Sequence, residues 1–539
     1  MRHLIKGCNN HLPILLAYSL LTLLFTYPLP FQLGTSLYGH ELVGFNADPF
    51  AEMDRFQSVK QNFLATGKLG FSPFIHPLVA YPGALLTAAF DEVVAFNLLL
   101  LISFPLAGFF AYLLAYQLTQ KRLPSFFAGL LYSFSPYHWV HAYYHLSLSQ
   151  IQWFPLYLSG LFLFSQKRSF PRGLLVMGSL LFLLFTNYYY ALFGLLLTLF
   201  FILYHGGFLF LNRGQKVFPF ASFWILLSLL TLAGLVFFLF FFNNLVLIYH
   251  NLPAFSARYP DLFRYSSRPW GFIFPPQDNP FLGWIGKNYI HSRLEGGTLV
   301  EHTLYLGLVP LLLSILAASG GLRGKPKPFL QSTSYYLGFF GILFVLALIF
   351  SRPPLSAMGG LSIPLPAYYL YPVFPMFRSY ARFGLLAYLA LALLAAGGLT
   401  LLHNRWPNKN WIPALAFLLL VIEYTNLPPW RNRPLLPTQA HLYLSEKARD
   451  LKIVDYFPQK FYDLPTIRKR MNNRLLAGGE MAAYELVDLS QPDLFQRLRL
   501  QGVSYAIFPP DRLRHLRDKG LQPVNRFPDS VLFRIDPLP

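Results

Sequence analysis

Three carboxylates stand close together after the first long apolar run of the chain. They are Asp48, Glu52 and Asp54, within the stretch from Gly44 to Phe56. Pro49 suits the first turn of a helix and Asp48 its N-cap, so one interpretation of Asp48 is a cap on a helix at the membrane surface. The other is a general base, since one positioned carboxylate can take a proton from an attacking hydroxyl. The two roles are compatible.

Glu52 and Asp54 lie a turn or more further along the same predicted helix. Three roles are open for them: they assist the reaction, bind a metal ion, or only solvate the outer face of the helix. We assign both to substrate binding. A divalent metal is compatible with these carboxylates but is not indicated, so we name no metal ligand and no certain cofactor.

Arginines occur in connections that we expect outside the membrane, where the orientation bias does not favour them. Phosphate binding is one explanation, because guanidinium groups grip phosphate with paired hydrogen bonds. Arg378 and Arg382 have the i, i+4 spacing that places both side chains on one helical face beside an apolar run. The alternative is that they extend to the headgroups of bulk lipid. We assign to phosphate binding Arg258, Arg264, Arg378 and Arg382, and leave Arg268 and Arg293 without a role.

Histidines and one further glutamate complete the set of candidate residues. His138, His141 and His145 have a spacing that lets one helical face carry several imidazoles. A metal site would also need carboxylates nearby, so the alternatives are interfacial histidines mixed with Tyr and Trp, or hydrogen bonding to a substrate. Glu301 begins the eighth predicted span. We assign His141, His145 and Glu301 to substrate binding.

These side chains need a scaffold, and the composition indicates helices in lipid. Hydrophobic residues make up 55% of the 539 and charged residues only 12%, too little polar surface for soluble domains of this size. The first apolar run is long and has no small-residue cleavage site, so we expect a retained anchor. About eleven spans are predicted, at 12–31, 92–118, 123–142, 146–165, 172–187, 189–210, 218–248, 302–319, 330–351, 383–402 and 410–427.

Every second predicted connection carries Lys or Arg, as the positive-inside rule requires. The sequence therefore predicts a bacterial inner-membrane protein with a cytoplasmic N-terminus. With an odd number of spans, the connections 32–91, 249–301 and 352–382 face outward, as does the C-terminal domain. The basic residues are Arg2, Lys6, Lys121, Arg122, Lys167, Arg168, Arg172, Arg213, Lys216, Arg323, Lys325, Lys327, Arg405 and Lys409.

The chain changes character near Pro429, where an ordinary soluble composition begins. We predict a membrane domain at 1–428 and a small α/β domain at 429–539 on the outer face. The domain is expected from β-like runs at Lys452 to Phe457, Ser504 to Phe508 and Ser530 to Ile535, with a helical stretch near Pro492 to Leu500.

Several functions are excluded or disfavoured. The single cysteine, Cys8, allows no intramolecular disulfide and no cysteine-based metal site. The net charge of +20 is explained by orientation and anionic lipid, and no nucleic-acid motif accompanies it. No phosphate-binding loop or dinucleotide fingerprint is present. Charge is sparse inside the spans, whereas ion-coupled transport needs ionisable groups near the membrane midplane.

The order of these features resembles the GT-C class of membrane glycosyltransferases, which includes protein mannosyltransferases and lipid A aminoarabinose transferases. The likeness is greatest to poorly characterised bacterial members such as the YfhO-like proteins, and it covers most of the chain. The segments that carry it are Asp48-Pro49, Tyr81-Pro82-Gly83, Asn97, Ser133 to Tyr137, Gln152 to Leu156, Glu301 to Gly307, and Phe374 to Arg382.

The resemblance implies a helical membrane fold, a donor sugar on a polyprenyl phosphate, and a carboxylate in the first outer loop as catalytic base. Asp48 is the matching position. Topology supports such a donor, because nucleotide sugars are cytoplasmic whereas these carboxylates are expected to face outward. Asp48 would deprotonate an acceptor hydroxyl of a saccharide, lipid or protein, and the sugar would be transferred with inversion. The arginines would stabilise the leaving phosphate. The chain departs from the class in one respect, since Asn46 replaces the first acid of an Asp-x-Asp pair.

Two other functions remain open from the sequence. One is a non-enzymatic role, either as a flippase for lipid-linked saccharide or in envelope assembly. The other is a saccharide polymerase or ligase, which also handles polyprenyl-linked sugars through arginines in a large outer loop but needs no base in its first loop. Replacement of Asp48 by Asn distinguishes a transferase from both.

Overall fold

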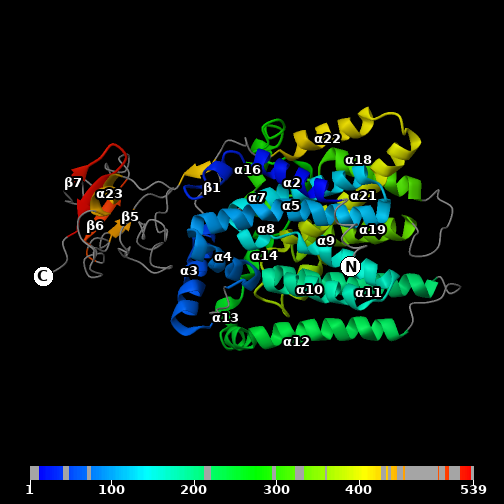
Figure 1. Ribbon diagram of the computed structural model, residues 1–539, viewed down its shortest axis with the longest axis horizontal. Coiled ribbons are helices and arrows are strands. Elements are labelled where there is room, and N and C mark those ends of the chain that lie inside the picture. Colours follow the sequence, from blue (N-terminus) through cyan, green and yellow to red (C-terminus); the bar gives the residue numbers. More distant parts are fainter. Residues whose placement is uncertain are drawn as a thin grey trace. The chain divides into compact units, whose positions relative to one another are not determined.

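The structure is a computed structural model, and it is mostly helical (Figure 1). It describes residues 11–39, 48–68, 75–211, 220–293, 299–321, 333–358, 361–425, 432–434, 439–445, 453–455, 496, 504–508 and 523–535. The chain forms two compact units. Unit 1 comprises 1–27, 71–79 and 99–431, and unit 2 comprises 28–70, 80–98 and 432–539.

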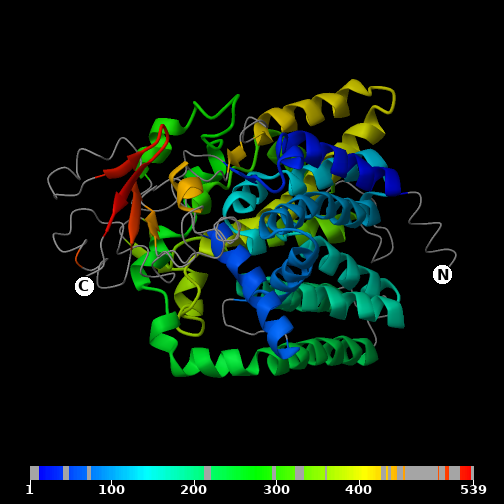
Figure 2. The ribbon, with the colours of Figure 1, turned by 60° about the vertical axis from the view of Figure 1, so that its left-hand side comes forward.

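Unit 1 is a bundle of apolar helices, and its long members lie side by side in Figures 1 and 2. α5 (Glu92–Thr119) begins in unit 2 and continues into this bundle. The other helices of unit 1 with more than eight residues are α2 (Leu12–Phe25), α6 (Arg122–Ser133), α7 (Pro136–Tyr144), α9 (Trp153–Gln166), α10 (Phe170–Thr186), α11 (Tyr188–Leu211), α12 (Phe220–His250), α18 (Leu308–Gly321), α19 (Thr333–Phe350), α21 (Gly384–Arg405) and α22 (Trp411–Tyr424).

Short elements connect these helices. They are η1 (Leu29–Phe31), which belongs to unit 2, and α8 (Leu146–Ser149), α13 (Leu252–Phe255), α14 (Tyr259–Arg264), α15 (Pro269–Ile273), α16 (Lys287–Arg293), α17 (Leu299–His302), α20 (Pro366–Leu370) and the 3-10 helix η4 (Tyr380–Phe383). A hairpin of β2 (Leu355–Met358) and β3 (Leu361–Pro364) follows α19.

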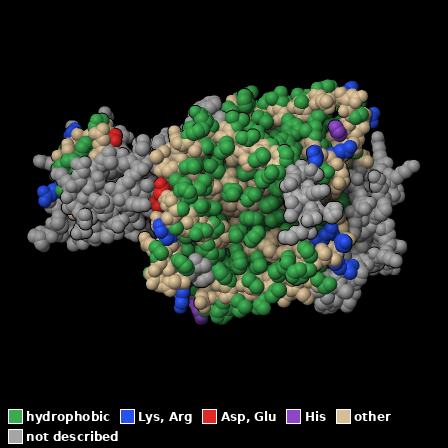
Figure 3. Space-filling model, viewed as in Figure 1, with side chains coloured by type: hydrophobic (Ala, Val, Ile, Leu, Met, Phe, Trp, Pro, Cys, Tyr) green, Lys and Arg blue, Asp and Glu red, His purple; other side chains and the backbone are tan. Residues whose placement is uncertain are grey.

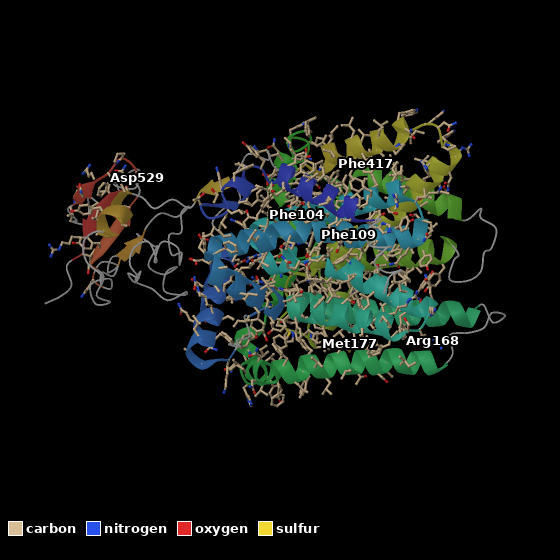
Figure 4. All side chains as sticks on the ribbon, viewed as in Figure 1. Phe104, Phe109, Arg168, Met177, Phe417 and Asp529 are labelled. Atoms are coloured by element: carbon tan, nitrogen blue, oxygen red, sulfur yellow. The ribbon has the colours of Figure 1, made fainter. Side chains whose placement is uncertain are left out.

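α21 forms the centre of the bundle and packs against α6, α18 and α19. Almost every side chain from Gly384 to Leu399 is buried. A helix that is apolar on all sides is stable only when neighbours or lipid surround it. Apolar side chains cover most of the helical flank in Figure 3, whereas Lys and Arg gather near its ends. Arg168 marks one such end in Figure 4, with Phe104, Phe109, Met177 and Phe417 along the helices.

Among the described residues, four helices are long and apolar enough to cross a membrane, at Glu92–Thr119, Tyr188–Gly207, Leu227–His250 and Tyr380–Arg405. Five of the six shorter apolar helices coincide with other predicted spans. The sixth, Pro77–Ala89, lies in the connection 32–91 and was not predicted. The apolar runs therefore predicted helices correctly. The number of about eleven crossings stays a prediction.

Two predicted spans are not single helices. The run 123–142 is divided between α6 and α7, because Ser135 adopts an extended conformation before Pro136 and caps α7 by accepting from the His138 N–H. The run 146–165 is divided between α8 and α9. The 12 residues of α6 span about 18 Å, less than the roughly 30 Å of a bilayer core.

The predicted span 302–319 also starts later than expected, since α18 begins at Leu308. Gly307 has a φ of +82°, a left-handed conformation that glycine adopts without strain because it has no Cβ. The chain changes direction there, before α18 begins. The carboxylate of Glu423 caps α18, with Oε1 2.9 Å from the Leu308 N and Oε2 3.2 Å from the Val309 N. The interpretation of Glu301 as the first residue of this span is therefore wrong.

Unit 2 contains α3 (Asp48–Thr66), most of α4 (Pro77–Ala89) and two sheets. β1 (Ser36–Tyr38) pairs antiparallel with β4 (Asn432–Pro434). After α23 (Gln439–Ser445), the second sheet has the order β5-β6-β8-β7 and consists of β5 (Ile453–Asp455), β6 (Tyr505–Phe508), β7 (Pro523–Arg526) and β8 (Val531–Arg534).

The second sheet confirms the three predicted strands and adds β7, which was not predicted. β5 and β6 are parallel, and the other pairs are antiparallel. The predicted helix at Pro492 to Leu500 lies outside the described residues except for Gln496. A separate domain at 429–539 stays a prediction, since unit 2 also includes 28–70 and 80–98.

Candidate functional site

Asp48 begins α3, and Pro49 follows it in the first turn of the helix, as predicted. The side chain of Asp48 is exposed, while Pro49 and Phe50 are buried. A carboxylate at this place is favoured by the partial positive charge of the helix N-terminus. Asp48 therefore lies at a helix end with its side chain exposed, which suits either a cap or a base.

Glu52 lies one turn after Asp48 but points inward, with only 4% of its surface exposed. Its Oε2 accepts a hydrogen bond from Arg55 Nη1 at 2.5 Å, and its buried Oε1 has no hydrogen-bond partner among the described residues. Burial raises the pKa of Glu52 and the negative charge of Asp48 raises it further, against the opposing effect of Arg55. Glu52 thus does not solvate the outer face of α3, and Asp54 on the same helix is half-buried.

Packing within unit 2 fixes α3. Phe56 is fully buried against Gly83 of α4, where a Cβ would overlap its ring. Gln57 Nε2 donates to Glu92 Oε2 at 2.7 Å, and Lys60 Nζ donates to the Thr87 carbonyl at 2.8 Å. These contacts tie α3 to α4 and to the start of α5, so the helix that carries Asp48 has a defined orientation within its unit.

The chain that precedes α3 is held by Asn97 of α5. Its Nδ2 donates to the carbonyl oxygens of Leu33 at 2.7 Å and Ser36 at 2.8 Å. Asn97 is fully buried, so both bonds form away from water and are costly to lose. Gly83 and Asn97, which lie in segments that carried the resemblance, therefore have structural roles: Gly83 packs against α3, and Asn97 holds the chain at Leu33 and Ser36.

A second group of candidate residues comes together in unit 1, around a buried ion pair. Arg382 Nη2 and Nε donate to Glu301 Oε1, at 2.6 and 3.0 Å. Arg382 is 9% exposed and Glu301 5%. The charges of Arg382 and Glu301 also act on Tyr137, and that of Arg382 acts on His141, so both residues lie near the pair. Segments far apart in the sequence thus meet at one place.

Arg378 and Arg382 have different surroundings. The helical turn begins only at Tyr380, so Arg378 lies in a non-helical segment and the expected shared helical face is wrong. Arg378 is exposed, and its guanidinium lies 5.0 Å from the ring centre of Tyr265. Within the described chain it makes no ion pair. Arg378 is therefore available to an external anion, whereas Arg382 already has a carboxylate partner.

The segment with Arg258 and Arg264 packs beside the segment with Arg378. The Ala257 N–H donates to the Pro375 carbonyl at 2.8 Å, and the Ala381 N–H donates to the Tyr265 carbonyl at 3.2 Å. Arg258 is exposed. Arg264 is exposed and lies 3.5 Å from the half-buried Asp261 in an ion pair. Both arginines remain candidates for phosphate binding.

His138 has different hydrogen-bond partners from His141 and His145, which contact each other. His138 is buried, with Nδ1 2.6 Å from the Ser133 carbonyl and Nε2 3.1 Å from Ser103 Oγ. It is a structural residue in the break between α6 and α7. His141 is also buried, and its Nδ1 lies 3.3 Å from Nδ1 of His145. His141 and His145 stay predicted substrate residues. The described part of the chain brings no three potential metal ligands together.

Two residues near this group were not selected from the sequence. Tyr189 contacts both Arg382 and the backbone at Arg378; its only signal is its place in the run Tyr188 to Tyr190 after a helix break. Arg352 donates to the Ser267 carbonyl at 3.3 Å, and burial together with the charge of Arg268 lowers its pKa. Arg352 follows an apolar run, as many interfacial arginines do, so the sequence did not distinguish it from an arginine that extends to lipid headgroups.

Comparison with known proteins supports the fold. The cryo-EM structure of arabinofuranosyltransferase AftD from Mycobacteria matches with a TM-score of 0.53 and 13% identity, covering 97% of this chain and 40% of AftD. A mutant AftD structure gives 0.55 and 12%, covering 97% and 41%. ArnT from Cupriavidus metallidurans, bound to undecaprenyl phosphate, gives 0.38 and 12%, covering 97% and 98%.

The chain thus spans about two fifths of the length of AftD. The match confirms, at the level of the fold, the predicted resemblance to GT-C membrane glycosyltransferases. No curated protein matches the chain. Residues 75–425 match the family described as a domain of unknown function, DUF6311. Because this match covers more than half of the sequence, the chain belongs to the DUF6311 family.

Proposed function

We propose that the protein is a membrane glycosyltransferase that moves a sugar from a polyprenyl-phosphate donor to an acceptor on the outer face of the bacterial inner membrane. The observation that carries the proposal is the exposed Asp48 at the start of α3 in a chain with the GT-C fold. A fold alone does not define an activity, so the proposal depends on the chemistry of this carboxylate.

In the proposed reaction an acceptor hydroxyl oxygen attacks the anomeric carbon of the donor. The bond between that carbon and the phosphate oxygen breaks, and polyprenyl phosphate leaves with the electron pair. Asp48 takes the proton of the hydroxyl, which makes the oxygen a better nucleophile. Attack opposite the leaving phosphate inverts the anomeric configuration. No metal ligand is assigned.

The phosphate is assigned to Arg378, with Arg258 and Arg264 as further candidates. Arg378 is exposed and makes no ion pair within the described residues, so its charge can stabilise a phosphate monoester as it forms. Arg382 has a different role, because Glu301 already neutralises it. His141, His145, Glu52 and Asp54 remain proposed contacts or supports of the substrates, which would be a sugar and a saccharide, lipid or protein acceptor.

The test is sugar transfer by the purified full chain in lipid nanodiscs. A set of hexosyl and pentosyl polyprenyl phosphates is supplied, and release of polyprenyl phosphate is measured, which also detects transfer to water when no acceptor is known. Asp48→Asn should reduce release by about 100-fold or more, the scale of lost general base catalysis. The matched control is Asp278→Asn, the same change at another carboxylate outside α3.

A loss of release in Asp48→Asn with normal expression and thermal stability supports the transferase. Equal release by the wild type and Asp48→Asn refutes Asp48 as the base and favours a polymerase or ligase. Movement of lipid-linked saccharide across the bilayer, with no release from any donor, favours the flippase.

A further inference from the structure

Tyr189 connects two parts of unit 1 that contain candidate residues. It lies at the start of α11, just after Asn187 ends α10 in an extended conformation. Its hydroxyl oxygen accepts hydrogen bonds from two successive backbone N–H groups, Arg378 at 3.1 Å and Ser379 at 3.2 Å. The ring of Phe377 meets the Tyr189 ring edge to face, with 4.8 Å between their centres.

The same ring also receives a buried cation. The guanidinium of Arg382 lies 4.4 Å from the centre of the Tyr189 ring, within the range of a cation–π interaction. The other partner of this guanidinium is Glu301. Arg382 therefore has a fixed position between a carboxylate and an aromatic face, and Tyr189 is fixed with it.

These contacts hold the non-helical segment from Phe377 to Ser379 at its backbone. Without Tyr189, the N–H groups of Arg378 and Ser379 have no hydrogen-bond acceptor elsewhere in the described residues. A segment without regular structure keeps one conformation only when such contacts outweigh its conformational entropy. The exposed Arg378 side chain thus starts from a backbone position set by the half-buried side chain of Tyr189.

We propose that Tyr189 is a positioning residue for phosphate binding, which holds the backbone of Arg378 so that its guanidinium faces the phosphate of the donor lipid. This inference rests on the proposed function. Its physical basis is preorganisation, because a guanidinium that is already placed loses less freedom when it binds. Tyr189 does not contact the phosphate; it acts through Arg378.

The test measures binding of polyprenyl monophosphate to the full chain in nanodiscs, with polyprenyl alcohol as the uncharged comparison. Tyr189→Phe removes one oxygen and keeps the ring that faces Arg382. The control is Tyr204→Phe on the same helix, whose hydroxyl donates to the Tyr335 carbonyl at 2.8 Å and takes no part in holding Arg378. Arg378→Gln and the double variant Tyr189→Phe with Arg378→Gln complete the set.

We expect Tyr189→Phe to raise the Kd for the phosphate about tenfold, since two backbone donors lose their acceptor. Binding of the alcohol and the thermal midpoint should change little, and Tyr204→Phe should bind as the wild type. In the Arg378→Gln background Tyr189→Phe should have less than about a twofold further effect, because a positioning residue has nothing left to position.

The outcomes separate the two proposals. If Arg378→Gln weakens phosphate binding and Tyr189→Phe does not, the role of Tyr189 is refuted while the proposed function stands. Additive effects of the two changes also refute it, because they indicate independent contributions. If the wild type binds the phosphate no better than the alcohol, the proposed function fails and the inference fails with it.

Discussion

Replacement of Glu301 by Gln isolates the charge of the buried ion pair in unit 1, because Gln has nearly the same shape. Both hydrogen bonds from Arg382 converge on Oε1, and the buried Oε2 has no hydrogen-bond partner in the described part of the chain. The variant keeps an oxygen that accepts from Arg382 but leaves the guanidinium without a counter-charge. Removing one partner of a buried pair costs about 3–5 kcal/mol.

Two features of the site reduce this cost. The Gln oxygen still accepts a hydrogen bond worth about 1 kcal/mol. The Tyr189 ring still faces the cation at 4.4 Å, and such an interaction contributes about 0.5–2 kcal/mol and is unaffected by the change. We therefore expect Glu301→Gln to lower the free energy of unfolding by about 2–3 kcal/mol.

Arg382→Met should cost more than Glu301→Gln. It leaves a carboxylate that is 5% exposed with neither oxygen bonded, so the full penalty of about 3–5 kcal/mol applies. The double variant Glu301→Gln with Arg382→Met removes both charges. It should be more stable than Arg382→Met alone, because the buried carboxylate is gone.

The assay is equilibrium unfolding of the full chain in mixed detergent micelles, followed by circular dichroism. The matched control is Asp261→Asn, the same loss of charge in the partly exposed Asp261–Arg264 pair at 3.5 Å, which should change stability by less than about 1 kcal/mol. The reasoning is refuted if Glu301→Gln is no more destabilising than Asp261→Asn, or if the double variant is less stable than Arg382→Met.

Two further predictions concern unit 2. Burial raises the pKa of Glu52 above its ordinary 4.5, so the folded chain holds more protons than the unfolded chain between the two pKa values. Stability should therefore fall as pH rises from about 4.5 through the raised pKa, and this fall should be smaller in Glu52→Gln; unchanged pH dependence of the unfolding midpoint would contradict it. Gly83→Ala should lower the free energy of unfolding by about 1–3 kcal/mol, because the added Cβ overlaps the Phe56 ring. Gly178→Ala is the control and should not destabilise, since its Cβ meets nothing within 4 Å. Equal thermal midpoints of the two variants would refute the close approach of Phe56 to Gly83.

The sequence predicted the elements whose signals are local. Apolar runs located the helices of the bundle, and Asp48-Pro49 correctly marked the start of α3. Three short β-like runs became strands of one sheet. The division of 123–142 was also encoded locally, since Ser135 precedes Pro136 and caps the next helix, but an apolar pattern of twenty residues concealed it. Hydrophobicity alone does not separate one crossing helix from two short ones.

The burial of Glu52 was not predictable from its own helix. Asp48 and Glu52 are the same kind of group one turn apart, and only contacts with α4 and the start of α5 decide which is exposed. The close approach of Phe56 to Gly83 and the bond from Gln57 to Glu92 turn the Glu52 side of α3 inward. Such contacts join residues more than twenty positions apart, which no helical periodicity contains.

Arg378 and Arg382 illustrate the same limit at the second group of residues. Both were predicted to bind phosphate because they are arginines with helical spacing. The structure separates them, since Glu301 approaches Arg382 from 81 positions away in the chain, while the helical turn excludes Arg378. A buried, neutralised guanidinium cannot attract a phosphate as an exposed one does, but it can fix the aromatic ring that holds the neighbouring backbone. In the proposed binding event, Arg378 thus contacts the phosphate, whereas Arg382 fixes Tyr189, which holds the backbone of Arg378.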